Sequence, residues 1–224
     1  VRGRATVHEA DAKRFFGALG LPVTREFLVC DADSALRAAA EIGWPVAIKV
    51  VSDQIAHKSE HGLVALAIGN EAALRDAYER LMRAAAESVP SASIAGFLVQ
   101  EMVRAGMETF VGVSREPDFG SVIACGVGGV GIEIFRDYAL RLLPLAAGDA
   151  AAMIAELKAY PLLQGARSAQ PYDIPALIAL IEAVGAIAWT ERDSLREIDL
   201  NPIKLFHGAD GCRIVDALIV PTAT

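Results

Sequence analysis

A lysine stands inside a strongly apolar segment of the chain, PVAIKVV at residues 45–51. In an extended strand the side chains alternate between two faces, which places Ala47, Lys49 and Val51 together. An amine on so apolar a strand is costly unless its charge is paired, and a bound phosphate is a suitable partner. A lysine on an edge strand, reaching solvent along its stem, is the alternative. Lys49 is therefore expected either to contact phosphate or to mark an edge.

A polar loop follows this segment, SDQIAHKSEHGLV at residues 52–64. Hydroxyl groups, a cation and a turn permitted by glycine can cradle a phosphate. An imidazole that titrates near neutral pH can also accept or relay a phosphoryl group. A solvated connecting loop is compatible with the same composition. The residues that could do this chemistry are Ser52, His57, Lys58, Ser59, Glu60, His61 and Gly62.

Four closely spaced glycines occur in CGVGGVGIEIF, residues 125–135. Glycine lets the backbone approach a ligand and point N–H groups at anions. The segment does not match the P-loop or the dinucleotide fingerprint, because no Lys-Ser/Thr pair follows and no helix clearly begins there. A phosphate-binding loop and a tight hairpin or bulge both remain open.

Oxygen ligands gather near the end of the sequence. Alternation puts Glu197, Asp199 and Asn201 on one side of a predicted strand, and Asp216 lies on the next strand. We expect these two strands to be antiparallel neighbours. Such a set of oxygens suits magnesium carried by a nucleotide, whereas scattered surface carboxylates are the alternative for any one residue.

The elements that must position these groups are predicted from capping signals, stop signals and β-branched runs. Helices are expected at 10–19, from Asp33 or Ser34 to Glu41, and at 71–87, 149–159 and 174–189. Strands are expected at 45–51, 96–103, 108–115, 121–127, 138–145, 195–200 and 212–220. Antiparallel hairpins without regular βαβ alternation predict an α+β fold.

Composition excludes several classes of function. A net charge of −7 and a pI near 5.1 disfavour binding to nucleic acid or to an anionic membrane, which needs clustered basic residues. No apolar run approaches the roughly 18 to 20 residues that cross a bilayer, and no secretory signal opens the chain. The three cysteines are far apart and form no C-x-x-C motif. A cytoplasmic protein with reduced thiols is expected.

Eight segments follow one another along the chain: GWPVAIKVVS, HKSEHG, LVQEMV, ETFVGV, GVGGVGIEIF, RLLPL, EIDLNP and RIVDALIV. Taken in this order, they resemble the ATP-grasp subunit or domain of ADP-forming acyl-CoA synthetases, a family related to succinyl-CoA synthetase β chains. The resemblance covers nearly the whole chain. It implies an ATP-grasp fold of two α+β lobes closing on a nucleotide, at residues 1–103, with the leading helix, and 104–224.

The resemblance also implies roles for individual residues. His57, beside Lys58, would relay a phosphoryl group between the nucleotide and a phosphohistidine on the CoA-binding component. Magnesium would be bound by Asn201 and Asp216, with Asp199 as a further candidate. Phosphate would be bound at Ser59, Gly62, Gly128 and Gly129. The nucleotide would contact Lys49, Ser52, Glu108 and the hinge residues Gln100, Glu101, Met102 and Val103.

The activity implied is that of an acid–CoA ligase using ATP or ADP with Mg²⁺, incomplete without a CoA-binding alpha subunit or a fused CoA-binding domain. The chain would then belong to a hetero-oligomer or to a longer polypeptide. Leu63 stands where the family motif has a second glycine. This motivates an alternative, a degenerate or regulatory nucleotide-binding module of a fusion protein such as an acetyltransferase. A purely structural domain would leave Lys49 and the carboxylates unexplained.

Overall fold

The computed structural model describes residue 7 and residues 9–52, 62–88, 94–128, 136–166 and 170–222. The chain divides into two compact units, each with a hydrophobic core of its own. The smaller unit comprises residues 24–103, and the larger unit comprises residues 1–23 together with 104–224. The chain therefore leaves the larger unit once and returns to it.

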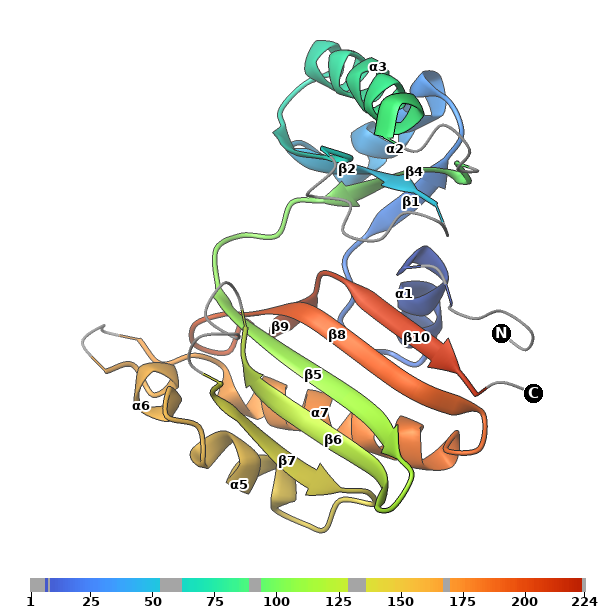
Figure 1. Cartoon of the computed structure of the whole chain (residues 1–224). Coiled ribbons are helices and arrows are strands. Elements are labelled where there is room, and N and C mark those ends of the chain that lie inside the picture. Colours follow the sequence, from blue (N-terminus) through green and yellow to red (C-terminus); the bar gives the residue numbers. More distant parts are fainter. Residues whose placement is uncertain are drawn as a thin grey trace. The chain divides into compact units, whose positions relative to one another are not determined.

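The smaller unit is a four-stranded antiparallel sheet with two helices on one face (Figure 1). The strand order is β1-β4-β2-β3. Side chains from both helices share one core with alternate residues of β2 and β4. The elements are β1 (Glu26–Val29), α2 (Ala32–Ile42), β2 (Val46–Val51), β3 (Val64–Ile68), α3 (Glu71–Ser88) and β4 (Gly96–Glu101).

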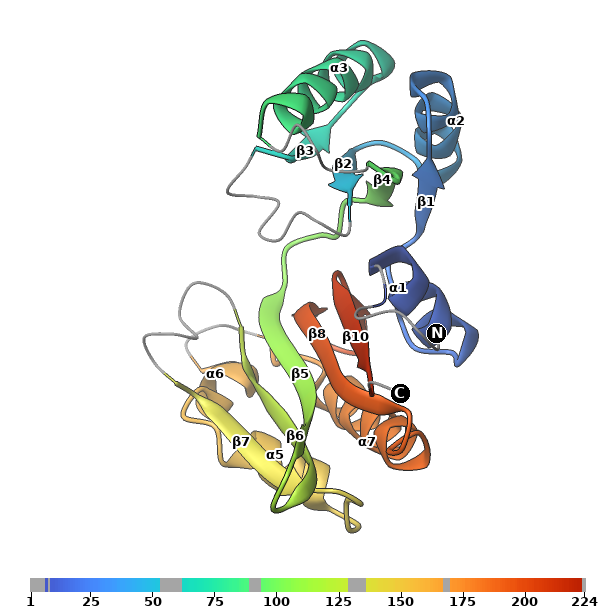
Figure 2. The same ribbon diagram turned by 45° about the vertical axis from the view of Figure 1, so that its right-hand side comes forward.

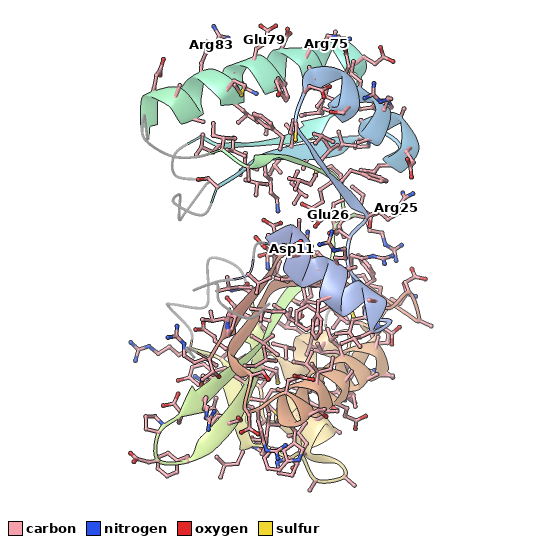
Figure 3. All side chains as sticks on the ribbon, turned by 90° about the vertical axis from the view of Figure 1, so that its right-hand side faces the viewer. Asp11, Arg25, Glu26, Arg75, Glu79 and Arg83 are labelled. Atoms are coloured by element: carbon pink, nitrogen blue, oxygen red, sulfur yellow. The ribbon has the colours of Figure 1, made fainter. Side chains whose placement is uncertain are left out.

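Local signals explain both helices of the smaller unit. The Asp31 carboxylate accepts a hydrogen bond from the Ser34 amide at 2.7 Å, which caps α2 two or three residues before the expected position. On α3 the charged side chains of Arg75, Glu79 and Arg83 point away from the sheet (Figure 3). The opposite, apolar stripe of α3 is buried, as expected for an amphipathic helix.

The larger unit contains a six-stranded antiparallel sheet with the order β10-β8-β5-β6-β7, where β9 pairs with the far part of β8. Helices α5 and α7 lie on one face of this sheet, as Figures 1 and 2 show. The remaining elements pack against the core of the larger unit or lie at the edges of its sheet. The elements are α1 (Glu9–Ala18), β5 (Met107–Glu116), β6 (Gly120–Val127), β7 (Tyr138–Leu142), α5 (Asp149–Ala155), α6 (Tyr160–Leu163), α7 (Ile174–Thr190), β8 (Leu195–Leu205), β9 (Cys212–Ile214) and β10 (Ala217–Pro221).

A β-bulge interrupts β8 and changes which side chains face the core. Ile198 and Leu200 are buried before it, and Ile203 and Leu205 are buried after it, so the parity switches from even to odd. The register against β5 shifts at the same place, between Thr109 and Val111 of that strand. An extra residue in one strand reverses the alternation of all that follow. Polar residues on both sides of the bulge thereby share the face that lies opposite the core.

The α+β architecture is confirmed, and several details differ from the expectations. The leading helix α1 was expected in the first lobe, but Phe16 is buried in the core of the larger unit and Val7 bridges Ile219. The expected strand 212–220 is two strands, because Val215 and Asp216 belong to neither of them. Strand β1 and the short helix α6 were not predicted, since neither carries a periodic pattern of its own.

The three cysteines differ in how far they are buried. Cys125 and Cys212 are buried free thiols, and burial raises the pKa of the first to about 12 and of the second to about 11. Cys30 is free and exposed. Among the residues that the structure describes, no helix has the length and apolar character needed to cross a membrane.

Candidate functional site

Lys49 lies on an interior strand of the smaller unit. Its strand β2 is flanked by β3 and β4, and Lys49 pairs with Val64 on one side and Leu98 on the other. The edge-strand interpretation is therefore wrong. Because Ile48 and Val50 point into the core beneath α2 and α3, Lys49 belongs to the opposite, helix-free face, where it is half-buried. This is a position from which an amine can reach a ligand bound over the sheet.

The expected hinge begins at the end of β4, and its first two side chains are engaged within the smaller unit. The Gln100 amide donates to Thr24 Oγ1 at 2.7 Å. The Glu101 carboxylate accepts from the Arg25 amide at 3.0 Å and from Arg25 Nε at 3.1 Å. Arg25 also donates to the carbonyl of Ile42 at 2.7 Å. These bonds fix the backbone of β4 where it meets residues 102 and 103.

Met102 and Val103 have no regular structure and are half-buried. Because the side chains of Gln100 and Glu101 are already hydrogen-bonded, an adenine would contact the backbone groups of residues 102 and 103. The nucleotide-binding role of Gln100 to Val103 stays a prediction.

The polar loop after β2 is described only at its two ends. His57, Lys58 and Ser59 lie outside the described residues. At one end Ser52 is buried. At the other, Gly62 has φ of 66°, in the left-handed region that favours glycine, and Leu63 is fully buried in the core. Leu63 thus packs into the core directly before β3, and Gly62 makes the turn that precedes it.

Glu108 and Lys204 form an ion pair on the helix-free face of the larger unit. Lys204 Nζ lies 2.7 Å from Glu108 Oε1, and the two residues are direct partners between β5 and β8. The predicted contact of Glu108 with the nucleotide therefore involves a carboxylate whose charge is already compensated. Sequence reasoning did not single out Lys204, because regular alternation places it on the face opposite Asp199. The bulge brings both to one face.

Gly128 follows β6, and its amide donates to the carbonyl of Glu108 at 2.6 Å. A Cβ at this position would lie 3.2 Å from the Glu108 carbonyl carbon, so the absence of a side chain permits the close approach. The amide of Gly128 is thus used inside the sheet, and Gly129 lies outside the described residues. For the first part of this segment the structure therefore supports a tight connection of the backbone.

The carboxylates near the end of the chain come together at the bulge. Asp199 pairs with Leu218 of β10, and the Asn201 amide donates to the Asp216 carbonyl at 3.3 Å, which places Asp216 beside the bulge. Burial, together with the negative charges of Glu197 and Asp216, raises the pKa of Asp199 to about 6. A nearby cation would therefore stabilise the ionised form of Asp199.

The donor set fits a magnesium ion. It offers two carboxylates and an amide oxygen, the hard ligands that Mg²⁺ prefers, and mutual repulsion among the acids that a divalent cation would relieve. Within the described ranges, no three Asp, Glu, His or Cys side chains converge tightly enough to hold a metal unaided. Ligands would also come from nucleotide phosphates, as is usual for Mg²⁺.

The chain matches the family of ATP-grasp domains over residues 1–220. It is 39% identical to the acetate–CoA ligase (ADP-forming) II subunit beta of Pyrococcus furiosus, over 98% of this chain and 93% of that one. It is 35% identical to the 4-hydroxybutyrate–CoA ligase (ADP-forming) of Nitrosopumilus maritimus, over 96% of this chain but 31% of that longer one.

A solved structure agrees with these matches. It is that of the dinucleotide-forming acetyl-coenzyme A synthetase 1 of Ca. Korarchaeum cryptofilum in complex with coenzyme A and Mg-AMPPCP, with its phosphohistidine segment pointing towards the nucleotide binding site. The TM-score is 0.85 at 37% identity, over 98% of this chain and 94% of that one. The expected fold and family are confirmed: the chain belongs to the ATP-grasp family, among the beta subunits and matching domains of ADP-forming acid–CoA ligases.

Proposed function

We propose that this chain is the nucleotide-binding component of an ADP-forming acyl-CoA synthetase. It transfers a phosphoryl group between ADP or ATP and a phosphohistidine, as one part of the reaction that converts acyl-CoA, ADP and phosphate into acid, CoA and ATP. The observation that carries this proposal is the match over nearly the full length of a beta subunit of such a ligase. The side chains on the helix-free faces of the two sheets fit this function. Lys49 on one face suits the binding of phosphate, and the carboxylates on the other suit the binding of a cation.

The residues divide the work by their chemistry. Lys49 compensates phosphate charge, and the backbone of residues 102 and 103 contacts the base. Asn201, Asp216 and Asp199 would hold Mg²⁺, which when bound neutralises charge on the phosphates. Lys204 pairs with the Glu108 carboxylate on the same face of the sheet. His57, supported by Lys58, Ser59 and Gly62, receives and passes on the phosphoryl group.

The proposal requires a second component that binds CoA. The Pyrococcus furiosus relative is a beta subunit of similar length, whereas the Nitrosopumilus maritimus relative is about three times as long as the part that this chain matches. The CoA-binding component is therefore an alpha subunit or a region of a longer polypeptide. We place the reaction in the cytoplasm, where the free thiols of the chain stay reduced.

A regulatory or degenerate module remains the second candidate because Leu63 replaces a family glycine. Its burial at 0% exposure shows that this position is occupied by a core side chain. The module would bind nucleotide without forming phosphohistidine. The two candidates thus differ in one measurable product.

Labelling with γ-phosphate-labelled ATP separates them. The chain is incubated with Mg²⁺ and a CoA-binding partner, and acid-labile, alkali-stable label on the chain is measured. We expect label on the wild type, none on His57→Ala, and wild-type label on the matched control His61→Ala. Label that persists in His57→Ala would exclude the relay role of that residue.

Nucleotide binding is tested separately by titration with ADP and Mg²⁺. Lys49→Ala should lose affinity by about 10- to 100-fold, the effect of removing one charge-assisted hydrogen bond. Lys158→Ala, which removes an exposed lysine of the larger unit, is the control and should bind normally. If the wild type binds no nucleotide even with the partner present, the proposed function fails.

A further inference from the structure

A lysine is buried on the leading helix, far in sequence from the residues predicted to form the site. Lys13 of α1 is 1% exposed. Its Nζ donates to the carbonyl oxygen of Val215 at 2.8 Å and lies 3.3 Å from a carboxylate oxygen of Glu9, one helical turn earlier. A buried amine is unfavourable unless it is paired and hydrogen-bonded, and an apolar side chain would fill the same space at lower cost. A packing role alone therefore does not explain Lys13.

Its acceptor belongs to a short link between two strands. Val215 and Asp216 join β9 to β10, and their backbone meets the bulge of β8. The Val215 amide donates to the Pro202 carbonyl at 3.0 Å, and the Asp216 carbonyl accepts from the Asn201 amide at 3.3 Å. The link is therefore held against the bulge by β8, while Lys13 supplies a bond to the carbonyl of Val215 from α1.

The carboxylate of Asp216 depends on this backbone. One of its oxygens, Oδ1, accepts from the amide of Ala217 at 2.8 Å, so the side chain is oriented by the residue that follows. A rotation of the peptide between Val215 and Asp216 would break its bond to Lys13 and change the backbone from which the Asp216 carboxylate projects. The bond from Lys13 to the carbonyl of that same peptide opposes such a rotation.

We propose that Lys13 is a positioning residue for the magnesium site: it fixes the peptide between Val215 and Asp216 and thereby the direction of the Asp216 carboxylate. This inference rests on the proposed function, since it takes Asp216 and Asn201 as ligands. It gives the leading helix a part in the site of the larger unit, through a bond between residues 202 positions apart in sequence. Groups behind a metal ligand commonly set its orientation in this way.

The probe is Mn²⁺ with ADP, measured by electron paramagnetic resonance on the whole chain, and activity is not needed. Lys13→Met keeps the length and apolar character of the stem and removes the donor. We expect its Mn²⁺ affinity to fall about tenfold, in the range for groups behind a metal ligand, while ADP binding in EDTA is unchanged. Lys13→Arg keeps a donor and should recover most of the affinity.

Arg14→Met is the matched control, since it removes a cation from the same helix whose side chain is 80% exposed and pairs with Asp11. It should bind Mn²⁺ as the wild type does. Should Lys13→Met fail to fold because Glu9 is left buried without its partner, the double variant Glu9→Leu/Lys13→Met removes both charges. This variant also lacks the bond to Val215 and is expected to show the same loss.

Wild-type Mn²⁺ affinity in either folded variant would overturn the inference. The proposed magnesium site is judged by a different result. If the wild type itself binds no Mn²⁺ in the presence of ADP, or if Asp216→Asn binds it equally well, both the site and the role of Lys13 are wrong.

Discussion

At the scale of single residues, the acidic side chains differ in their surroundings: some are paired with a basic side chain, whereas Asp199 lies near other acids. Glu108 is paired with Lys204, and Glu101 with Arg25. Burial, together with the charges of nearby acids, raises the pKa of Asp199 to about 6. The negative charge of Asp199 therefore destabilises the metal-free fold and favours the binding of a cation.

This difference predicts a pH dependence of stability in EDTA. Because the folded-state pKa of Asp199 is raised from 3.8 to about 6, its contribution to stability is full below about pH 4 and is lost as the pH rises to about 6. Asp199→Asn mimics the neutral form. Its free energy of unfolding should exceed that of the wild type by about 1 to 2 kcal/mol at pH 7, after allowance for solvent screening, with the gain vanishing near pH 4.

Urea unfolding at the two pH values measures this gain. Asp193→Asn, which changes an exposed carboxylate in the turn before β8, is the control and should show no pH-dependent gain. A gain of equal size at both pH values would mean that Asp199 acts by its shape and not by its charge.

At the scale of elements, close approaches of the backbone shape the sheet of the larger unit. Gly126 of β6 lies on the helix-free face, beneath the ring of its partner Phe110. A Cβ there would lie 2.5 Å from the carbonyl oxygen of Asp137 and 2.6 Å from the Phe110 ring. A backbone oxygen cannot move aside as the end of a side chain can.

Gly126→Ala should therefore lower the free energy of unfolding by about 1 to 3 kcal/mol, the usual cost of overpacking. Gly112→Ala is the control in the neighbouring strand, because its Cβ would meet only the Ile198 carbonyl oxygen, at an ordinary 3.7 Å. Chemical denaturation of the two variants compares them directly. Equal stability would show that β6 and β7 separate at little cost.

Most elements could be predicted from the sequence because their signals are local. The β-branched run of β2, the turn-linked hairpin of β5 and β6 and the apolar helix α7 each carry a strong pattern. The bulge in β8 could not be predicted, since it follows from pairing with a distant strand and not from residues 195–205 alone. Lys204 and Lys13 were missed for the same reason: their partners, Glu108 and Val215, lie far away in sequence.

The site was predicted unevenly for a related reason. Residue types and spacing pointed to Lys49 and to the carboxylates, and the structure places the carboxylates beside one another at the bulge. The resemblance implied a phosphate-binding role for Gly128, but its amide is bonded to the Glu108 carbonyl. A glycine permits a close approach, but its sequence does not say whether the approaching group is a ligand or a neighbouring strand.

At the scale of the whole molecule, the two units have separate cores, and α1 contributes to only one of them. Phe16→Ala should cost about 3 to 5 kcal/mol, as is typical for a large core aromatic, and should loosen the larger unit alone. Hydrogen exchange followed residue by residue would show faster exchange in β5 and β8, with unchanged protection in β2 and β4.

Leu19→Ala is the control for this measurement, because Leu19 follows α1 and is 50% exposed. It should leave exchange in both units unchanged. Equal loss of protection in both units on Phe16→Ala would mean that they unfold as one body.

The two ends of the smaller unit are held together just inside its boundaries, with Glu26 paired to Gln100 and the Glu101 amide bonded to the Arg25 carbonyl. In topological terms residues 24–103 are an insertion whose entrance and exit are neighbours. Such a segment can be replaced as one unit, because β1 and β4, the strands at its two ends, pair with each other in a fixed register. A graft of the corresponding segment from a relative, joined at these two points, would therefore transfer the lysine-bearing sheet without a cut through either core.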